Sequence, residues 1–264
     1  LHDDYIVKLF SGLPRAQAYR LLLEEKPQRL RGVVRRPLRR SGREPLASPL
    51  HAEREAQPFL FPVDAHLLHG AGTTVLIDAR GGGYMARNGL MMTRFHESCH
   101  LPSGMRIYLR DSQSGAYWCA TDPAISRTAR FETSQAVFEH ERLHVRASLR
   151  VFVNPLDGAV LHCLTLENAA AAERMLEVCS YLEPALCSRR DDEAHPSYQN
   201  LFVRTERTHR YGLMATRRPK AEGDSPARLW HLLCSDTQFS VFHMQTDRTA
   251  FLGRGRSVYA PRAL

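Results

Sequence analysis

The sequence lacks any run of about 18 apolar residues, so no segment of it could cross a membrane as a helix. It begins with Leu1 and carries no positively charged stretch followed by an apolar one, so we expect no signal peptide and interpret the chain as an excerpt of a longer protein. No Cys-x-x-Cys pair occurs among the six cysteines, most of which lie in apolar stretches. We therefore expect free thiols in a reducing, cytoplasmic compartment, although the even count leaves disulfides open.

Recognisable catalytic motifs are missing too. There is no Gly-x-Ser-x-Gly motif, no His-Glu-x-x-His motif and no Gly-Lys-Ser/Thr phosphate loop. His96, Cys99 and His100 stand close together, but no second ligand pair accompanies them at a metal-site spacing. This favours an ordinary polar loop, and we predict no catalytic residue and no metal site.

Basic charge is concentrated near the start of the chain. The net charge is +8, and residues 1–57 hold 12 Lys and Arg against 7 Asp and Glu, whereas the remainder holds 24 against 21. Seven arginines fall within residues 29–43 with no acid between them, which is consistent with a nucleic-acid or lipid-surface contact or with a solvated linker. Repeated prolines and the lack of aromatic residues between Tyr19 and Phe59 favour the linker, so we predict no nucleic-acid partner.

Periodicity divides the chain into three parts. Three- and four-residue spacing of apolar residues predicts a helical segment at 1–27, and an Arg/Pro-rich linker follows at 28–58. From residue 59 to 264, period-two alternation with turns every ~8–12 residues predicts a large antiparallel β-sandwich, an all-β fold. No strand–helix–strand alternation follows residue 59, which argues against a parallel α/β sheet.

The clearest predicted strand spans residues 142–153, where apolar and polar side chains alternate, and the next returns over 160–167 after a turn. Further strands are predicted at 73–78, 90–96, 105–111, 116–120, 129–132, 136–140, 175–182, 200–207, 210–216, 229–235 and 239–245.

Two stretches interrupt this strand pattern, one with consecutive glycines and one with several polar side chains. Gly81-Gly82-Gly83-Tyr84 allows positive φ and a close approach of the backbone to a ligand, with a tyrosine that could stack on a sugar. The alternative is a tight turn with a packed tyrosine. Residues 194–200 combine His, Tyr, Gln and Asn, which offer neutral donors and acceptors for sugar hydroxyls, and the alternative is a plain polar loop.

These stretches belong to a longer series of motifs that occur in order over about residues 60–264. The series comprises Gly81-Gly82-Gly83-Tyr84, Met92-Thr93-Arg94-Phe95, Ile107-Tyr108-Leu109-Arg110-Asp111, Ser180-Tyr181-Leu182-Glu183, His195-Pro196, Asn200-Leu201-Phe202-Val203, Ala215-Thr216-Arg217-Arg218-Pro219 and Phe251-Leu252-Gly253-Arg254-Gly255-Arg256. It resembles the glycoside phosphorylase family that contains cellobiose and chitobiose phosphorylases, and within that family the carboxyl-terminal region of cyclic β-1,2-glucan synthases.

The resemblance implies a super-sandwich fold related to galactose mutarotase and a parent enzyme that cleaves β-glucosides with inorganic phosphate. In that family the catalytic acid and most phosphate ligands belong to an (α/α) barrel that follows the sandwich. The resemblance therefore implies a non-catalytic sandwich domain with no cofactor, in which phosphate is a co-substrate of the parent enzyme. The implied partners are that barrel and a β-glucan or β-linked disaccharide.

The resemblance also implies site residues. The segment aligned with Tyr198, Gln199 and Asn200 approaches the acceptor sugar in the cellobiose-specific members, so we expect these three to contact sugar, with Tyr84 and Arg94 as further candidates. The synthases carry tryptophans near the positions of Ala86 and Phe95, which this sequence lacks.

Two other functions are considered beside a phosphorylase or synthase domain: a stand-alone carbohydrate-binding module and an Arg-mediated binder of nucleic acid or lipid. The synthase resemblance implies a parent anchored in the inner membrane, with this part facing the cytoplasm.

Overall fold

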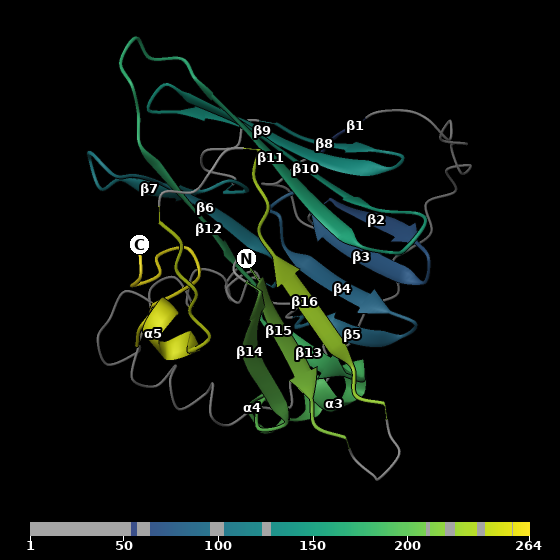
Figure 1. Ribbon diagram of the computed structural model, residues 1–264. Coiled ribbons are helices and arrows are strands. Elements are labelled where there is room, and N and C mark those ends of the chain that lie inside the picture. The colour runs from purple at the N-terminus through teal and green to yellow at the C-terminus, as the bar shows by residue number, and fades with distance from the viewer. Residues whose placement is uncertain are drawn as a thin grey trace, which may run out of the picture.

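The computed structural model describes residues 54–56, 64–95, 103–122, 128–209, 212–219, 225–236, 241–254 and 256–264. The predicted helical segment 1–27, the arginines of 29–43 and the cluster of His96, Cys99 and His100 lie outside the described residues. The described residues form antiparallel β-sheets with short helices between them (Figure 1). The predicted all-β sandwich is therefore confirmed.

Sheet A contains the strands with the strongest alternation. Its strands, in spatial order, are β1 (Arg54–Ala56), β8 (Thr128–Glu132), β9 (Gln135–Arg142), β10 (Val145–Val153) and β11 (Val160–Asn168). In β10 every second residue from Val145 to Val153 is buried while Arg146 and Arg150 are exposed, as predicted. The strand starts later than predicted, because Leu143 and His144 adopt φ of 51° and 61° in the two-residue turn after β9.

The other sheets continue the antiparallel pattern. Sheet B has the spatial order β13 (Pro184–Cys187), β5 (Leu90–Thr93), β4 (Gly83–Arg87), β3 (Thr73–Asp78) and β2 (Ala65–Gly70). Sheet C consists of β12 (Leu176–Tyr181), β6 (Arg106–Asp111) and β7 (Tyr117–Cys119). Sheet D consists of β14 (Val203–His209), β15 (Gly212–Arg217) and β16 (Arg228–Leu232).

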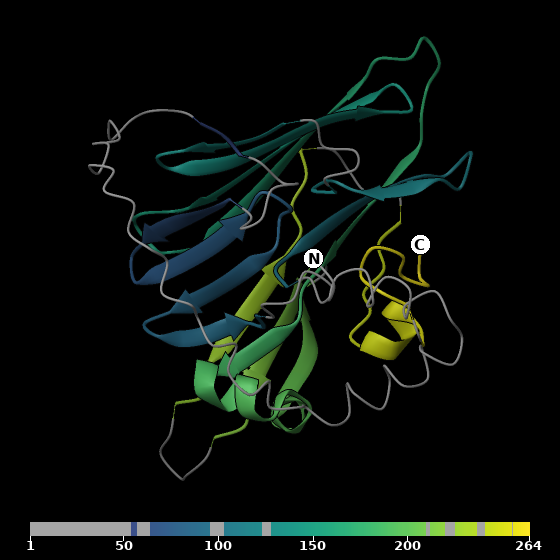
Figure 2. The same cartoon turned by 180° about the vertical axis from the view of Figure 1, so that it is seen from behind.

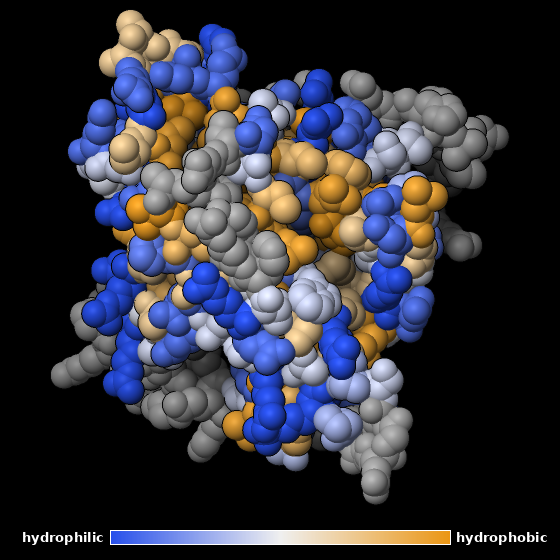
Figure 3. Space-filling model, viewed as in Figure 1, coloured by the Kyte–Doolittle hydropathy of each residue, from blue (hydrophilic) through white to orange (hydrophobic). Residues whose placement is uncertain are grey.

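The largest core cluster joins sheets A and B. Phe131 and Phe138 of sheet A are buried in one cluster with Val75 and Ile77 of sheet B. Burying side chains of this size stabilises the fold by about 1.5–3 kcal/mol each. Figure 3 shows that the hydrophobic side chains of the front face gather mainly in its upper half, around these two sheets.

Smaller clusters attach sheet D and the C-terminal helix. Met92 and Leu186 of the sheet B region pack with Leu229 of sheet D. The helix α5 (Arg248–Leu252) packs its Phe251 against the Tyr108 ring of sheet C. Figure 2 shows α5 well apart from the helices α3 (Arg189–Ala194) and α4 (Pro196–Asn200), which lie beneath sheets B and D.

Several predictions need correction. The predicted strand at 239–245 is wrong over its described residues, because 241–245 form no strand. The predicted strand at 90–96 ends at Thr93, and the loop predicted at 194–200 contains a helix. The strand β1 falls within the stretch 28–58 and pairs with β8.

The described cysteines are free thiols, as predicted: Cys119, Cys163, Cys179, Cys187 and Cys234. Among the residues that the structure describes, no helix is long and apolar enough to span a membrane. The same residues include no group of three His, Cys, Asp or Glu side chains arranged to hold a metal ion.

Candidate functional site

The short helices α3 and α4 carry the candidate residues, and α4 occupies most of the stretch 194–200, for which a plain polar loop was the alternative. Ser188 begins α3 because its side-chain oxygen accepts a hydrogen bond from the backbone N–H of Asp191 at 3.1 Å. Asp191 and Asp192 lie in the first turn, where carboxylates are favoured by the helix dipole. Pro196 takes the first position of α4, the helical position that tolerates proline best.

Arg94, directly after β5, holds these helices to sheet B. Its Nε and Nη2 donate to Asp192 Oδ1 at 3.1 and 2.9 Å, and both side chains are buried, with only 7% and 6% of their area exposed. The Arg94 backbone N–H also donates to the carbonyl oxygen of Glu183 at 2.9 Å. A buried guanidinium paired in this way to a buried carboxylate is costly to break from either side.

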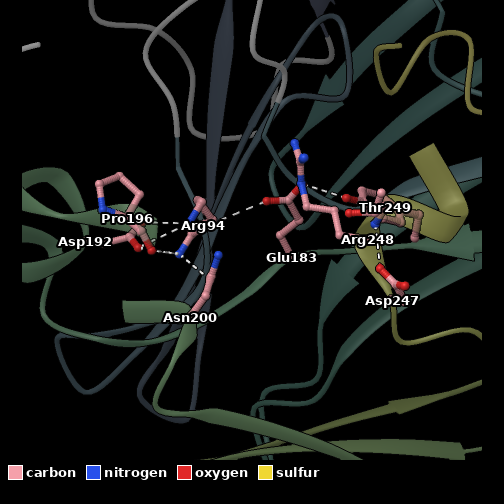
Figure 4. A network of polar contacts seen from close by, with 9 residues as sticks. Arg94, Glu183, Asp192, Pro196, Asn200, Asp247, Arg248 and Thr249 are labelled. Carbon is pink, nitrogen blue, oxygen red and sulfur yellow. Dashed lines mark hydrogen bonds and ion pairs between the residues drawn. The ribbon is translucent and has the colours of Figure 1, made fainter. Parts of the chain in front are cut away.

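The network continues to α5 through Glu183 (Figure 4). Its carboxylate lies 3.9 Å from Arg94 Nη1 and accepts from Arg248 Nε at 2.9 Å and from the Tyr181 hydroxyl at 2.5 Å. Burial alone would raise the pKa of Glu183, but Arg248, Tyr181 and Arg94 together outweigh burial and lower it. Glu183 is therefore ionised at neutral pH.

Asn200, at the end of α4, is held by the same arginine. Its Oδ1 accepts from Arg94 Nη2 at 2.9 Å, and the carbonyl oxygen of Pro196 accepts from the same nitrogen at 3.1 Å. Asn200 is exposed, so its side chain lies between a buried ion pair and solvent. The structure thus brings together two of the predicted site residues, Arg94 and Asn200.

Gln199 points to another arginine. Its Oε1 accepts from Arg217 Nη2 at 2.7 Å, and the Arg217 guanidinium lies 5.2 Å from the centre of the Phe202 ring. Phe202 also meets Tyr198 edge-on, with ring centres 5.0 Å apart. Gln199 is only 7% exposed, whereas Tyr198 is 56% exposed, so the three consecutive predicted residues face different surroundings.

Tyr84 lies in β4, and its ring contacts Phe95. The two rings meet edge-on with centres 5.2 Å apart, and the Arg189 guanidinium lies 5.4 Å from the centre of the Phe95 ring. Tyr84 therefore reaches the neighbourhood of α3 through Phe95. Among the described residues, no hydrogen bond, ion pair or ring contact joins Tyr84 to Asn200 or Gln199.

The glycines before Tyr84 serve the packing of the protein itself. Gly83 adopts φ of 140°, and a Cβ there would lie 1.8 Å from the carbonyl oxygen of Leu76. A Cβ on Gly81 would meet the Thr121 side chain at 2.3 Å. Asp78 accepts from the backbone N–H of Gly82 at 2.7 Å. These contacts identify a tight turn rather than a loop that approaches a ligand.

The carboxylates of this cluster are unsuited to general acid catalysis. Asp192 is paired with Arg94, and Glu183 has a lowered pKa, whereas a general acid needs a raised one. The surface of α4 offers instead an aromatic ring at Tyr198 and a neutral amide at Asn200. Such groups bind polar, uncharged ligands through stacking and hydrogen bonds.

Sequence reasoning missed Asp192, Glu183 and Arg217 as partners of the predicted residues. A signal was present for the helix that carries Asp192, since Ser188 followed three residues later by Asp191 is typical of a helix start. No local signal pairs Arg94 with a carboxylate 98 residues away.

Comparison with known proteins adds a family and a relative. The family model "Glycosyl hydrolase 94, supersandwich domain" matches residues 57–264. The chain is 29% identical over 271 residues to the cyclic beta-(1,2)-glucan synthase NdvB of Rhizobium meliloti (strain 1021). That match covers 94% of this chain and 9% of the relative, so the chain spans a small part of the relative's length.

Proposed function

This chain belongs to the glycosyl hydrolase 94 supersandwich family, and on that premise we propose that it is the carbohydrate-binding sandwich domain of a carbohydrate phosphorylase or a cyclic β-1,2-glucan synthase-type enzyme. The family predicted from the sequence motifs is confirmed. The ligand proposed is a β-glucan or a β-linked disaccharide, and the proposed contact surface is the exposed side of α4 with Tyr198 and Asn200.

One observation supports this proposal above the others. The family match spans the described sandwich, and within it α4 carries an exposed aromatic ring at Tyr198 and, two residues later, an exposed amide at Asn200. Aromatic rings stack on sugar faces, and amides exchange hydrogen bonds with sugar hydroxyls without the cost of desolvating a charge. The relative's name refers to a β-1,2-linked glucan, which suggests the linkage to test first.

The domain binds rather than cleaves in this proposal. The buried carboxylates of Asp192 and Glu183 near α4 are engaged with arginines, so neither of them is suited to act as a proton donor. The catalytic acid and the site for inorganic phosphate then belong to an (α/α) barrel elsewhere in the parent protein. In this proposal the sandwich contributes contacts to the sugar site of the parent protein.

Calorimetric titration of the 264-residue chain with β-1,2-glucan, and in parallel with cellobiose, tests the binding. We expect saturable binding of the glucan and about tenfold weaker binding after Asn200→Ala or Tyr198→Ala, the loss expected for one or two polar or stacking contacts. The matched control is Leu156→Ala, at an exposed position in the turn after β10, which should bind like the wild type.

If neither β-1,2-glucan nor cellobiose gives a heat of binding, the binding proposal is contradicted. The enzymatic part is tested by assaying the parent enzyme for phosphate-dependent release of glucose 1-phosphate from β-glucans and β-disaccharides. No release from any of them would contradict a phosphorylase.

A stand-alone carbohydrate-binding module is the second candidate, and one observation favours it. Trp230 on the edge strand β16 is 54% exposed, opposite Met214 of β15, on an open face of sheet D. An exposed tryptophan on a flat sheet face is a stacking surface for sugar rings. If the module binds there, Trp230→Ala should abolish glucan binding, whereas Asn200→Ala should leave it unchanged.

A further inference from the structure

Consecutive amides on α4 are each held by an arginine from a distant strand. Asn200 Oδ1 accepts from Nη2 of Arg94, which follows β5, at 2.9 Å. Gln199 Oε1 accepts from Nη2 of Arg217, the last residue of β15, at 2.7 Å. The two amides therefore receive the same kind of contact from two different sheets.

This contact determines which end of each amide is left for a ligand. A guanidinium can only donate hydrogen bonds, so the amide atom that faces it must be the oxygen. The NH2 group of each amide then points away from its arginine. Neither Asn200 Nδ2 nor Gln199 Nε2 has a hydrogen-bond partner among the residues that the structure describes. Gln199 is only 7% exposed, but its Nε2 is not among the fully buried atoms that lack a hydrogen-bond partner, so this NH2 group reaches solvent.

Both arginines are themselves held in place. Arg94 is fixed by Asp192 and Glu183. Arg217 lies against Phe202, and its Nε and Nη1 are buried without an acceptor among the described residues. Within that part of the chain, Gln199 Oε1 is thus the one acceptor of the Arg217 guanidinium. Arg217 therefore does not serve to form an ion pair among the described residues. Its hydrogen bond to Gln199 fixes the orientation of that amide instead.

We propose that Arg94 and Arg217 are positioning residues, which hold Asn200 and Gln199 by their oxygens so that the two NH2 groups donate to hydroxyl oxygens of a bound β-glucan. This proposal rests on the proposed function of the domain. Donors fixed in advance bind more tightly, because no side-chain freedom is lost when the ligand arrives. The ligand edge that meets α4 is accordingly the one that presents oxygen lone pairs.

A double-mutant cycle in the 264-residue chain tests the first pair. Binding of β-1,2-glucan is measured for Arg94→Lys, Asn200→Ala and the double variant, with thermal unfolding followed in parallel. We expect about tenfold weaker binding for Asn200→Ala and about fivefold for Arg94→Lys, with the double variant no weaker than Asn200→Ala, because the arginine acts through the amide. Additive losses would overturn the proposal, since a general loosening of the fold would weaken binding independently of Asn200.

The Arg217→Lys and Gln199→Ala cycle repeats the test in case Arg94→Lys does not fold. Arg174→Lys is the matched control, because Arg174 contacts the Asp111 carboxylate at 3.2 Å and no amide among the described residues. We expect the control to bind glucan like the wild type, and an equal loss there would count against a specific role for Arg94 and Arg217.

Nuclear magnetic resonance relaxation of the side-chain NH2 groups separates this proposal from the proposed function. We expect rigid amides in the wild type, with Arg94→Lys releasing Asn200 alone and Arg217→Lys releasing Gln199 alone. Rigid amides in a chain that binds no glucan would contradict the proposed function but uphold the orientation of the amides by the arginines. Mobile amides in the wild type would overturn the positioning proposal itself.

Discussion

Sheet A and the segment of α3 and α4 are held together by different kinds of interaction. In sheet A, β9 and β10 are joined by a two-residue turn, and β10 pairs residue by residue with β11, from Val145↔Asn168 to Val153↔Val160. The helices α3 and α4 have only six and five residues, and Arg94 reaches Asp192 from 98 positions earlier in the chain. The strands β8 to β11 of sheet A are paired with near neighbours in the chain, whereas the α3–α4 segment depends on a distant ion pair.

The difference shows where stability comes from in each region. A strand whose every second residue is buried contributes through apolar area, which many side chains share. A helix of one or two turns is not stable alone, because its few hydrogen bonds contribute less free energy than nucleation of the helix costs. The fold of α3 and α4 therefore rests on few contacts, and removing one of them should have a large effect.

Breaking the distant ion pair should produce the largest effect. Arg94→Met leaves the Asp192 carboxylate buried without its partner, and we expect the free energy of unfolding to fall by about 3–5 kcal/mol. The matched change in sheet A is Arg146→Met, which removes pairs to Glu141 and Glu167 at 3.1 and 3.2 Å. All three of those side chains are exposed, so we expect no resolvable change there. Urea unfolding of both variants measures the difference.

If Arg94→Met unfolds at the same urea concentration as Arg146→Met, the ion pair does not hold the α3–α4 segment. Asp192→Asn provides a second measurement, because it keeps the size of the side chain and removes the charge. We expect a smaller loss than for Arg94→Met, because Arg94 loses its closest carboxylate but keeps Glu183 at 3.9 Å.

Acidification should have an intermediate effect, through a histidine of sheet A. His162 of β11 has its pKa lowered from 6.5 to about 4, first by burial and then by the nearby His231 of β16. As the pH falls below about 6.5, His162 becomes protonated in the unfolded chain but stays neutral in the folded chain. The free energy of unfolding therefore decreases progressively between pH 6.5 and about 4. Because His162 is half-buried, we expect a loss on the order of 2 kcal/mol.

Unfolding in urea at a series of pH values measures this loss. His162→Gln should flatten the dependence between pH 6.5 and 4, although His140 and His231, whose pKa values are also lowered by burial, leave part of it. A variant with the same slope as the wild type would show that His162 does not carry the effect.

The strands that could be predicted from the sequence are those with their own alternation. The strand predicted at 73–78 is β3, and the predicted alternation of β10 is confirmed by its burial. The strand β2 was missed because its pattern is imperfect, with Leu67 57% exposed beside a buried Leu68. The four-residue β13 was missed because it starts at a proline and is too short to show a period.

The candidate site was predictable only in part, for a related reason. Short motifs identified Arg94 and Asn200, and the structure joins them. The partners that give them their roles come from elsewhere in the chain, and no spacing rule connects Arg94 with Asp192 or Gln199 with Arg217. Gln199 shows the same limit, because it is buried and its hydrogen-bond partner Arg217 lies 18 residues later, in sheet D.

The smallest effect should come from the one local signal in the α3–α4 segment. Ser188→Ala removes the side-chain acceptor at the start of α3, and we expect a loss of about 1 kcal/mol, as for other helix caps. Ser148→Ala in β10 is the matched control and should change stability by no more than about 0.5 kcal/mol, because that serine makes no side-chain hydrogen bond among the described residues. Urea unfolding of both variants checks this difference. A loss at Ser188 as large as that of Arg94→Met would mean that α3 depends on its cap as much as on the ion pair, and the contrast between local and distant support would then be wrong.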